Sequence, residues 1–213
     1  MSYSVKEIYF TLQGEGARAG RSAVFCRFSS CNLWNGKEED RSSASCWFCD
    51  TDFNGTDGPG GGKFARHGDL ANAIASRWPD TKQGVPYVVF TGGEPLLQLD
   101  TKVLNAMHNL GFESAVETNG TIIAPKGIDW LTVSPKPNSK LRQVSGDELK
   151  LVYPQEVSPE SLDELDFTHF YLSPRTDSEE EVSKKNTRLA IDYCQKNPKW
   201  QLTMQYHKIW GIA

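Results

Sequence analysis

Long hydrophobic runs are missing from this chain of 213 residues. No stretch approaches the ~18 consecutive apolar residues of a membrane-spanning helix, so we expect no membrane association. The chain begins without a basic stretch followed by an apolar segment, and we therefore expect no secretory signal. A basic excess is also missing, because the net charge is −4, which argues against a nucleic-acid partner. Together these absences predict a cytoplasmic protein.

An even set of cysteines, typical of disulfide-linked secreted domains, is missing too: the chain has five. Cys31, Cys46 and Cys49 form the pattern C-x14-C-x2-C, and such a cluster predicts metal binding. The other two are poor additional ligands, since Cys26 lies in an apolar predicted strand and Cys194 in a predicted helix. Zinc usually takes four protein ligands in a structural site, whereas three thiolates also suit a [4Fe–4S] cluster with one open iron. The spacing alone leaves both metals open.

Short segments rich in β-branched and aromatic residues alternate with amphipathic ones. They predict strands at residues 5–12, 23–29, 86–91, 113–118, 130–134, 148–152, 169–173 and 201–206. A helix begins after Asp100, with Val103, Leu104, Met107 and Leu110 on one face and Gly111 as its stop; another covers residues 178–197. This alternation predicts an α/β fold of parallel βαβ units. Three or four clear helices are too few for a closed barrel, so we predict an open partial (β/α) barrel.

A set of short motifs adds a family resemblance. The sequence TGGEP at residues 91–95 follows a predicted strand and, together with the three cysteines, resembles the radical S-adenosylmethionine (SAM) superfamily. Further motifs occur in order: FTLQGEG (10–16), FCRF (25–28), CNLW (31–34), CDTD (49–52), ETNG (117–120) and SPK (134–136). The ordered set resembles the 7-carboxy-7-deazaguanine synthase family of that superfamily.

The resemblance implies a single radical SAM domain over residues 1–213. Most of the superfamily has C-x3-C-x2-C, so the fourteen-residue gap here implies a cluster-binding loop insert at about residues 32–45. A second segment, residues 55–62, holds five glycines and one proline, and we expect it to be a mobile loop.

The implied activity is that of a radical SAM lyase. It converts 6-carboxy-5,6,7,8-tetrahydropterin to 7-carboxy-7-deazaguanine with loss of ammonia, in 7-deazapurine (queuosine) biosynthesis. The implied cofactors are a [4Fe–4S] cluster, SAM and Mg²⁺, with SAM regenerated in each cycle. An activase that places a radical on a partner protein, and a zinc-binding module without enzymatic activity, are the alternatives.

Residue roles also follow from the resemblance. Cys31, Cys46 and Cys49 would bind three irons, and SAM would chelate the fourth through its amino and carboxylate groups. The implied SAM-binding residues are Phe48, Cys49, Asp50, Gly93, Glu117, Ser134, Pro135, Lys136, Ser173, Pro174, Arg175 and Thr176. Most of them follow predicted strands, where open α/β sheets bind ligands.

The implied substrate-binding residues are Leu12, Gln13, Gly14, Glu15, Arg27, Thr91, His207 and Ala213. Arg27 can form a two-pronged pair with the substrate carboxylate. Thr51 would help to hold Mg²⁺, which prefers oxygen ligands. The carboxylate of Ala213 can accept hydrogen bonds from the amide–amine edge of a pterin. The implied partners are this small molecule, an electron donor such as flavodoxin or ferredoxin, and a second copy of the chain in a homodimer.

Overall fold

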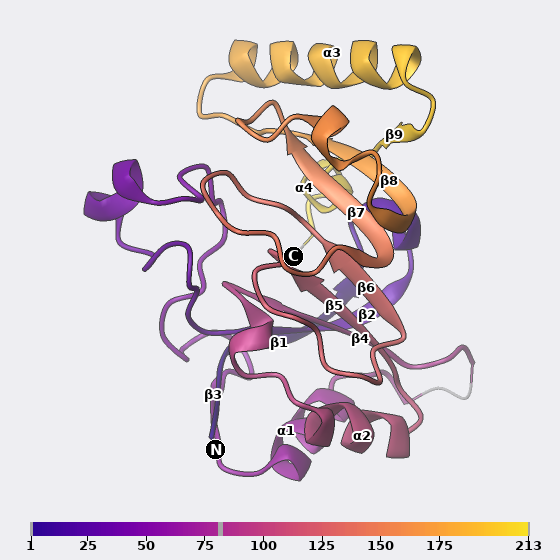
Figure 1. Cartoon of the computed structure of the whole chain (residues 1–213). Helices are drawn as coiled ribbons and strands as arrows, with labels where there is room; N and C mark the ends of the chain where they lie inside the picture. Colours follow the sequence, from indigo (N-terminus) through magenta and orange to yellow (C-terminus); the bar gives the residue numbers. More distant parts are fainter. Residues whose placement is uncertain (1, 81–82, 213) are drawn as a thin grey trace.

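One sheet of nine strands runs through the computed structural model, which describes residues 2–80 and 83–212 (Figure 1). The strand order is β3-β1-β2-β4-β5-β6-β7-β8-β9. The strands are β1 (Tyr3–Leu12), β2 (Ser22–Phe28), β3 (Gly62–Phe64), β4 (Tyr87–Gly92), β5 (Glu113–Thr118), β6 (Trp130–Val133), β7 (Ser145–Tyr153), β8 (Asp166–Pro174) and β9 (Trp200–Leu202).

Along the sheet, β2, β4, β5, β6, β7, β8 and β9 pair in parallel, each with the next, whereas β1 pairs antiparallel with both β2 and β3. Within the described residues the outer strands β3 and β9 do not pair with each other, so the barrel is open. This arrangement confirms the predicted α/β fold. In the same part of the chain, no helix has the length and apolar character needed to cross a membrane.

Three of the helices cover one face of the sheet. The helices are α1 (His67–Ala75), α2 (Thr101–Asn109), α3 (Glu180–Lys196) and α4 (Tyr206–Trp210). Buried residues of α1, α2 and α3 share one apolar core with the strands, and Figure 1 shows α1 and α2 at one end of the molecule and α3 at the other. This leaves the opposite face of the sheet free to line a cavity.

Helix α2 forms as the sequence predicts. The Asp100 carboxylate accepts hydrogen bonds from the backbone N–H groups of Lys102 and Val103, both at 3.0 Å, which is the geometry of an N-cap. Val103 is fully buried. Leu110, expected on the same face, is 43% exposed because the helix ends at Asn109.

Strand β7 places apolar side chains on one face of the sheet and charged side chains on the other. Leu149 and Leu151 are fully buried in the core shared with the helices. Glu148 and Lys150 alternate with them and therefore point to the opposite, concave face, as successive strand residues do. Charged side chains thus reach the interior of the open barrel.

One predicted strand differs from the structure. The predicted strand at residues 201–206 stops at Leu202, because the Tyr206 N–H donates to the Gly14 carbonyl oxygen at 2.9 Å, which turns the chain away from the sheet into α4. The glycine-rich segment 55–62 is mostly a loop, and its mobility stays a prediction. It lies along β1, where the Ile8 N–H donates to the Pro59 carbonyl oxygen at 2.7 Å.

Candidate active site

A cavity of about 410 Å³ opens at the carboxyl ends of the parallel strands. It brings together nearly all of the residues that the sequence singles out. From the cofactor set, Cys31, Cys46, Phe48, Cys49, Asp50, Thr51, Gly93, Glu117, Ser134, Lys136, Ser173, Pro174, Arg175 and Thr176 line it. From the substrate set, Leu12, Gln13, Gly14, Glu15, Arg27, Thr91 and His207 line it. Of the remaining two, Pro135 is not part of the lining, and Ala213 lies outside the described residues.

The three cysteines approach the cavity from two loops. Cys31 follows β2, while Cys46 and Cys49 share a tight turn in which the Cys49 N–H donates to the Cys46 carbonyl oxygen at 3.2 Å. The Leu33 N–H points at the Cys31 sulfur at 3.4 Å. A hydrogen bond from the Cys46 thiol lowers the pKa of Cys49 to about 6, and the Lys136 ammonium acts in the same direction. Thiolates are soft ligands for iron, so this donor set fits a [4Fe–4S] cluster.

The segment between the first two cysteines is ordered by Arg41. Its Nη1 donates to the carbonyl oxygens of Trp47 and Cys49 at 2.9 and 2.8 Å. The guanidinium also lies 4.2 Å from the ring centre of Trp34. The insert therefore folds back and holds the backbone of the turn that carries the second and third cysteines.

The Gly92-Gly93 pair at the end of β4 has a close neighbour. A Cβ atom on Gly93 would lie 2.3 Å from the Ser30 carbonyl oxygen and 2.6 Å from the Cys31 Cβ. The glycine lets the first cysteine loop approach the strand, which sequence reasoning missed. Glu94 is fully buried and accepts hydrogen bonds from Thr118 and from the Asn119 N–H, both at 2.8 Å, so it joins the ends of β4 and β5.

On the cysteine side of the cavity, Asp50 is tied to the C-terminal region. Its carboxylate accepts from Lys208 at 2.7 Å and from Gln205 at 3.2 Å. Burial opposes ionisation of Asp50, but these contacts lower its pKa overall. Near the same thiols, the Lys136 ammonium donates to the Ser134 carbonyl oxygen at 3.0 Å, which places a positive charge beside the cysteines.

On the opposite side, Arg27 is held by β1. Its Nε lies 2.7 Å from a Glu7 carboxylate oxygen, and its Nη2 donates to the Tyr9 hydroxyl at 3.0 Å. The Tyr9 ring in turn stacks on Phe25, with ring centres 5.6 Å apart. Glu7 and Tyr9 were not anticipated from the sequence, although they alternate along a strand that ends in the FTLQGEG motif.

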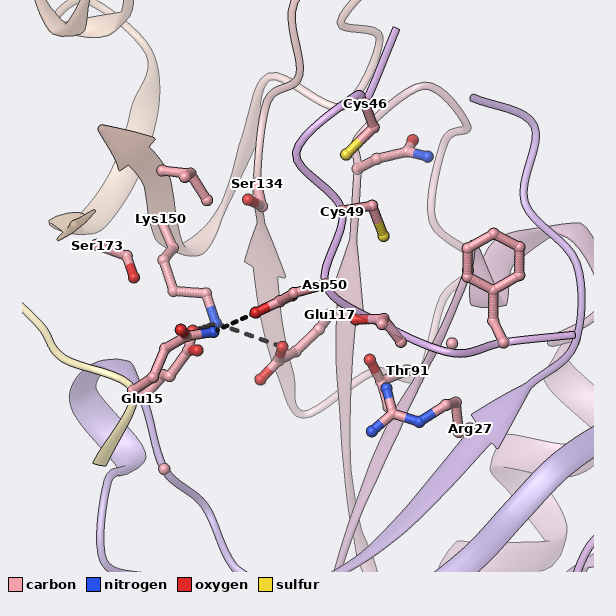
Figure 2. A pocket seen from close by; sticks show the side chains of 18 of the residues that line it. Glu15, Arg27, Cys46, Cys49, Asp50, Thr91, Glu117, Ser134, Lys150 and Ser173 are labelled. Carbon is pink, nitrogen blue, oxygen red and sulfur yellow. Dashed lines mark hydrogen bonds and ion pairs between the residues drawn. The ribbon is translucent and has the colours of Figure 1, made fainter. Parts of the chain in front are cut away.

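The loop after β1 crosses the concave face of the sheet. Gln13 Nε2 donates to Glu117 at 2.8 Å, and Glu15 lies 2.6 Å from Lys150 (Figure 2). A Cβ atom on Gly14 would lie 2.4 Å from His207 Nδ1, so this glycine allows the C-terminal region to approach. Glu117 therefore contacts the predicted substrate loop, and its predicted contact with SAM stays a prediction.

Sequence reasoning also missed two buried charges on β7. Lys150 is 5% exposed and lines the cavity, and Glu148 is 2% exposed. Burial raises the pKa of Glu148 to about 7, although the Lys150 charge opposes the shift. The signal was present in the sequence, because charges alternating with leucines in a central strand must point at a polar interior.

Thr51 lies beside the third cysteine, with Asp50 and Asp52 on either side of it, and lines the cavity. In the described part of the chain, no group of three or more His, Cys, Asp or Glu side chains converges on one metal ion, the three cysteines included, whereas a [4Fe–4S] cluster binds each thiolate to a different iron. The Mg²⁺ site at Thr51 stays a prediction.

No family model matches the chain. It is 55% identical to 7-carboxy-7-deazaguanine synthase of Caulobacter vibrioides and 54% identical to that of Bordetella pertussis, each over the whole of both chains. The crystal structure of QueE from Escherichia coli matches with a TM-score of 0.70 at 27% identity, covering 97% of this chain and 95% of that one. This match confirms the predicted open barrel of the radical SAM type, and the full-length identities show that the chain belongs to the 7-carboxy-7-deazaguanine synthase family.

Proposed function

We propose that this protein converts 6-carboxy-5,6,7,8-tetrahydropterin to 7-carboxy-7-deazaguanine with loss of ammonia, using a [4Fe–4S] cluster and SAM. The observation that supports it most is the composition of one cavity. Three thiols line one side, and an arginine with several carboxylates lines the other, in a chain that matches synthases over its full length.

When bound, the cluster and SAM would supply the radical chemistry for removing a hydrogen atom from the pterin. The chain's own residues would hold SAM and the pterin in place and exclude water from the site. Cys31, Cys46 and Cys49 would bind the cluster. The positive charge of Lys136 beside the thiols suits a carboxylate, such as that of SAM.

The opposite wall suits the pterin. The guanidinium of Arg27 is held in place by Glu7 and Tyr9 and can form charge-assisted hydrogen bonds with the substrate carboxylate. Glu15 and Glu117 offer acceptors to the amide and amine N–H groups of the ring. The ligand would thus be held at both ends between the cysteine loops and the concave face of the sheet.

Three further proposals concern the surroundings of this site. Thr51 would hold Mg²⁺ through its hydroxyl oxygen, a hard ligand that suits this ion. Flavodoxin or ferredoxin would supply the electron that starts each catalytic cycle. The enzyme would act as a cytoplasmic homodimer.

Anaerobic incubation with the carboxytetrahydropterin, SAM and a reductant, followed by mass spectrometry, tests the reaction. We expect a product with the mass of 7-carboxy-7-deazaguanine and no net consumption of SAM. A protein that cleaves SAM without forming this product would refute the proposed substrate. A colourless, iron-free protein after anaerobic purification would instead point to a zinc-binding module.

A further inference from the structure

A buried lysine stands in the cavity wall without a role in the reaction described above. Lys150 is 5% exposed and lies on the concave side of β7. Its ammonium lies 2.6 Å from a Glu15 carboxylate oxygen and 3.3 Å from a Glu117 carboxylate oxygen (Figure 2). Glu15 belongs to the loop after β1 and Glu117 to β5, so this one side chain joins three separate parts of the chain.

Lys150 and Glu117 keep each other ionised. Burial alone would lower the pKa of Lys150, but Glu117, Glu15 and Glu148 raise it instead. Burial likewise raises the pKa of Glu117, yet the Lys150 charge and the hydrogen bond from Gln13 bring it below its usual value. Among the described residues, further titratable groups around this cluster are Tyr9 of β1, Arg27 of β2, Tyr87 of β4, Glu148 of β7, Tyr171 of β8 and His207 of α4, which lies against Gly14.

The path of the loop after β1 does not depend on Lys150. The Gly16 N–H donates to the Thr203 hydroxyl at 2.8 Å, and the Ala17 N–H donates to Glu148 at the same distance. On its other side, the Gly14 carbonyl oxygen accepts from the Tyr206 N–H at 2.9 Å. Loss of the ammonium would therefore leave the backbone in place and release the Glu15 carboxylate.

We propose that Lys150 is a positioning residue that fixes Glu15 and Glu117 as two charged acceptors and so selects a ligand edge made only of donors. An ionised carboxylate accepts hydrogen bonds and cannot donate them. A ligand with a carbonyl in place of an N–H group would leave a buried acceptor unpaired, which costs affinity. The inference rests on the proposed function, because a pterin presents such an edge through its ring amide and exocyclic amine.

The test measures binding of 6-carboxypterin, an oxidised probe that keeps this edge, to anaerobically reconstituted enzyme with SAM present. Lys150→Met removes the charge while keeping most of the side-chain length. Lys199→Met is the matched control, because Lys199 is exposed and its ammonium lies 4.0 Å from the Phe170 ring, outside the cavity. SAM binding is measured for each variant.

We expect the affinity of wild type for 6-carboxypterin to change less between about pH 5.5 and about pH 7 than that of Lys150→Met, since the Lys150 charge keeps Glu117 ionised. Lys150→Met should bind the probe about tenfold more weakly than wild type at the lower pH and recover partly at the higher one, where Glu117 loses its proton. SAM affinity, and both affinities of Lys199→Met, should change by less than about twofold.

A second probe, 6-carboxylumazine, carries a carbonyl where the pterin has its amine. Wild type should bind it at least about tenfold more weakly than 6-carboxypterin, and Lys150→Met should discriminate less, because a protonated carboxyl can donate to the carbonyl.

The inference would be overturned if Lys150→Met bound 6-carboxypterin as tightly as wild type does. It would also be overturned if the variant lost affinity for 6-carboxypterin and SAM alike, independently of pH. If the variant does not fold, the wild-type measurements still decide, since wild type that binds 6-carboxylumazine as tightly as 6-carboxypterin contradicts the inference. Wild type that binds no 6-carboxypterin at all would refute the proposed function itself. Wild type that binds the probe, with Lys150→Met binding it equally well, would refute the role of Lys150 alone.

Discussion

The guanidinium of Arg27 is oriented by Glu7 and Tyr9. Replacing Arg27 by Ala should cost ~2–5 kcal/mol of binding for a ligand with a carboxylate, largely through the unpaired charge left behind. We expect 6-carboxypterin to lose affinity by orders of magnitude, whereas pterin without the carboxylate loses little. Titration calorimetry with both ligands checks this. An equal loss of affinity for the two ligands would mean that Arg27 stabilises the cavity wall and does not bind the carboxylate.

The cysteines allow a matched pair of substitutions. Cys46 is buried and lines the cavity, whereas Cys194 lies in α3 and is absent from the lining. Cys46→Ala should abolish the brown absorbance and the bound iron after anaerobic reconstitution. Cys194→Ala should leave both unchanged, and if it removes iron as completely, the assignment of three cluster ligands is wrong.

At the scale of residues, the sequence predicts side chains whose chemistry is marked by a motif. The cysteines, the glycine pair and Arg27 all line the cavity as expected. Lys150 and Glu148 were missed because no motif marks them, and their meaning depends on which face of β7 is concave. That information comes from the pairing of strands far apart in the chain.

The insert between Cys31 and Cys46 is the element whose geometry the sequence could not supply. Arg41 in this insert donates to two backbone carbonyl oxygens of the cysteine turn. Each such bond from a charged donor contributes about 1.5–3 kcal/mol. Arg41→Ala should therefore loosen the turn, and the reconstituted cluster should be lost several times faster in the presence of an iron chelator.

The control for this element is Lys37→Ala. Lys37 also lies between the two cysteines, but its side chain is 64% exposed and pairs with Glu39 at 3.7 Å. Loss of iron is followed by the decay of the cluster absorbance. Equal decay rates in wild type and Arg41→Ala would show that the insert does not support the cluster.

Elements were predicted well where local signals agree, as in α2, with its Asp100 cap and periodic apolar face. They were predicted poorly where a contact between distant parts of the chain determines the local structure. Residues 201–206 alternate like a strand, but the bond from Tyr206 to Gly14 diverts them into α4. Strand β3 depends in the same way on pairing with β1 across the glycine-rich segment.

At the scale of the whole molecule, the buried Glu148 makes stability depend on pH. Its pKa is raised to about 7, whereas a carboxyl in an unfolded chain titrates near ~4.3. Between these values the native state binds a proton that the unfolded state has released, so stability falls as the pH rises through this window. Ionised Glu148 therefore destabilises the fold at and above neutral pH.

Glu148→Gln should remove this dependence while its amide oxygen still accepts from the Ala17 N–H. We expect the free energy of unfolding to rise by about 1–3 kcal/mol above about pH 7 and to change little near about pH 5. Urea unfolding followed by circular dichroism at the two pH values measures both. A variant that is less stable at both pH values would show that the attraction between Glu148 and Lys150 stabilises the fold by more than burial of the Glu148 charge destabilises it.

The hydrogen bonds that hold the loop after β1 also set the order in which the molecule is assembled. Ala17 bonds to a residue 131 positions later in the chain, and Gly16 to one 187 positions later. On the ribosome, the N-terminal loop and the cysteines emerge long before their partners, and contacts of such long range form late. The part of the cavity wall that these bonds hold is therefore completed only when translation is nearly finished, and iron delivered before that moment would meet an unfinished cavity.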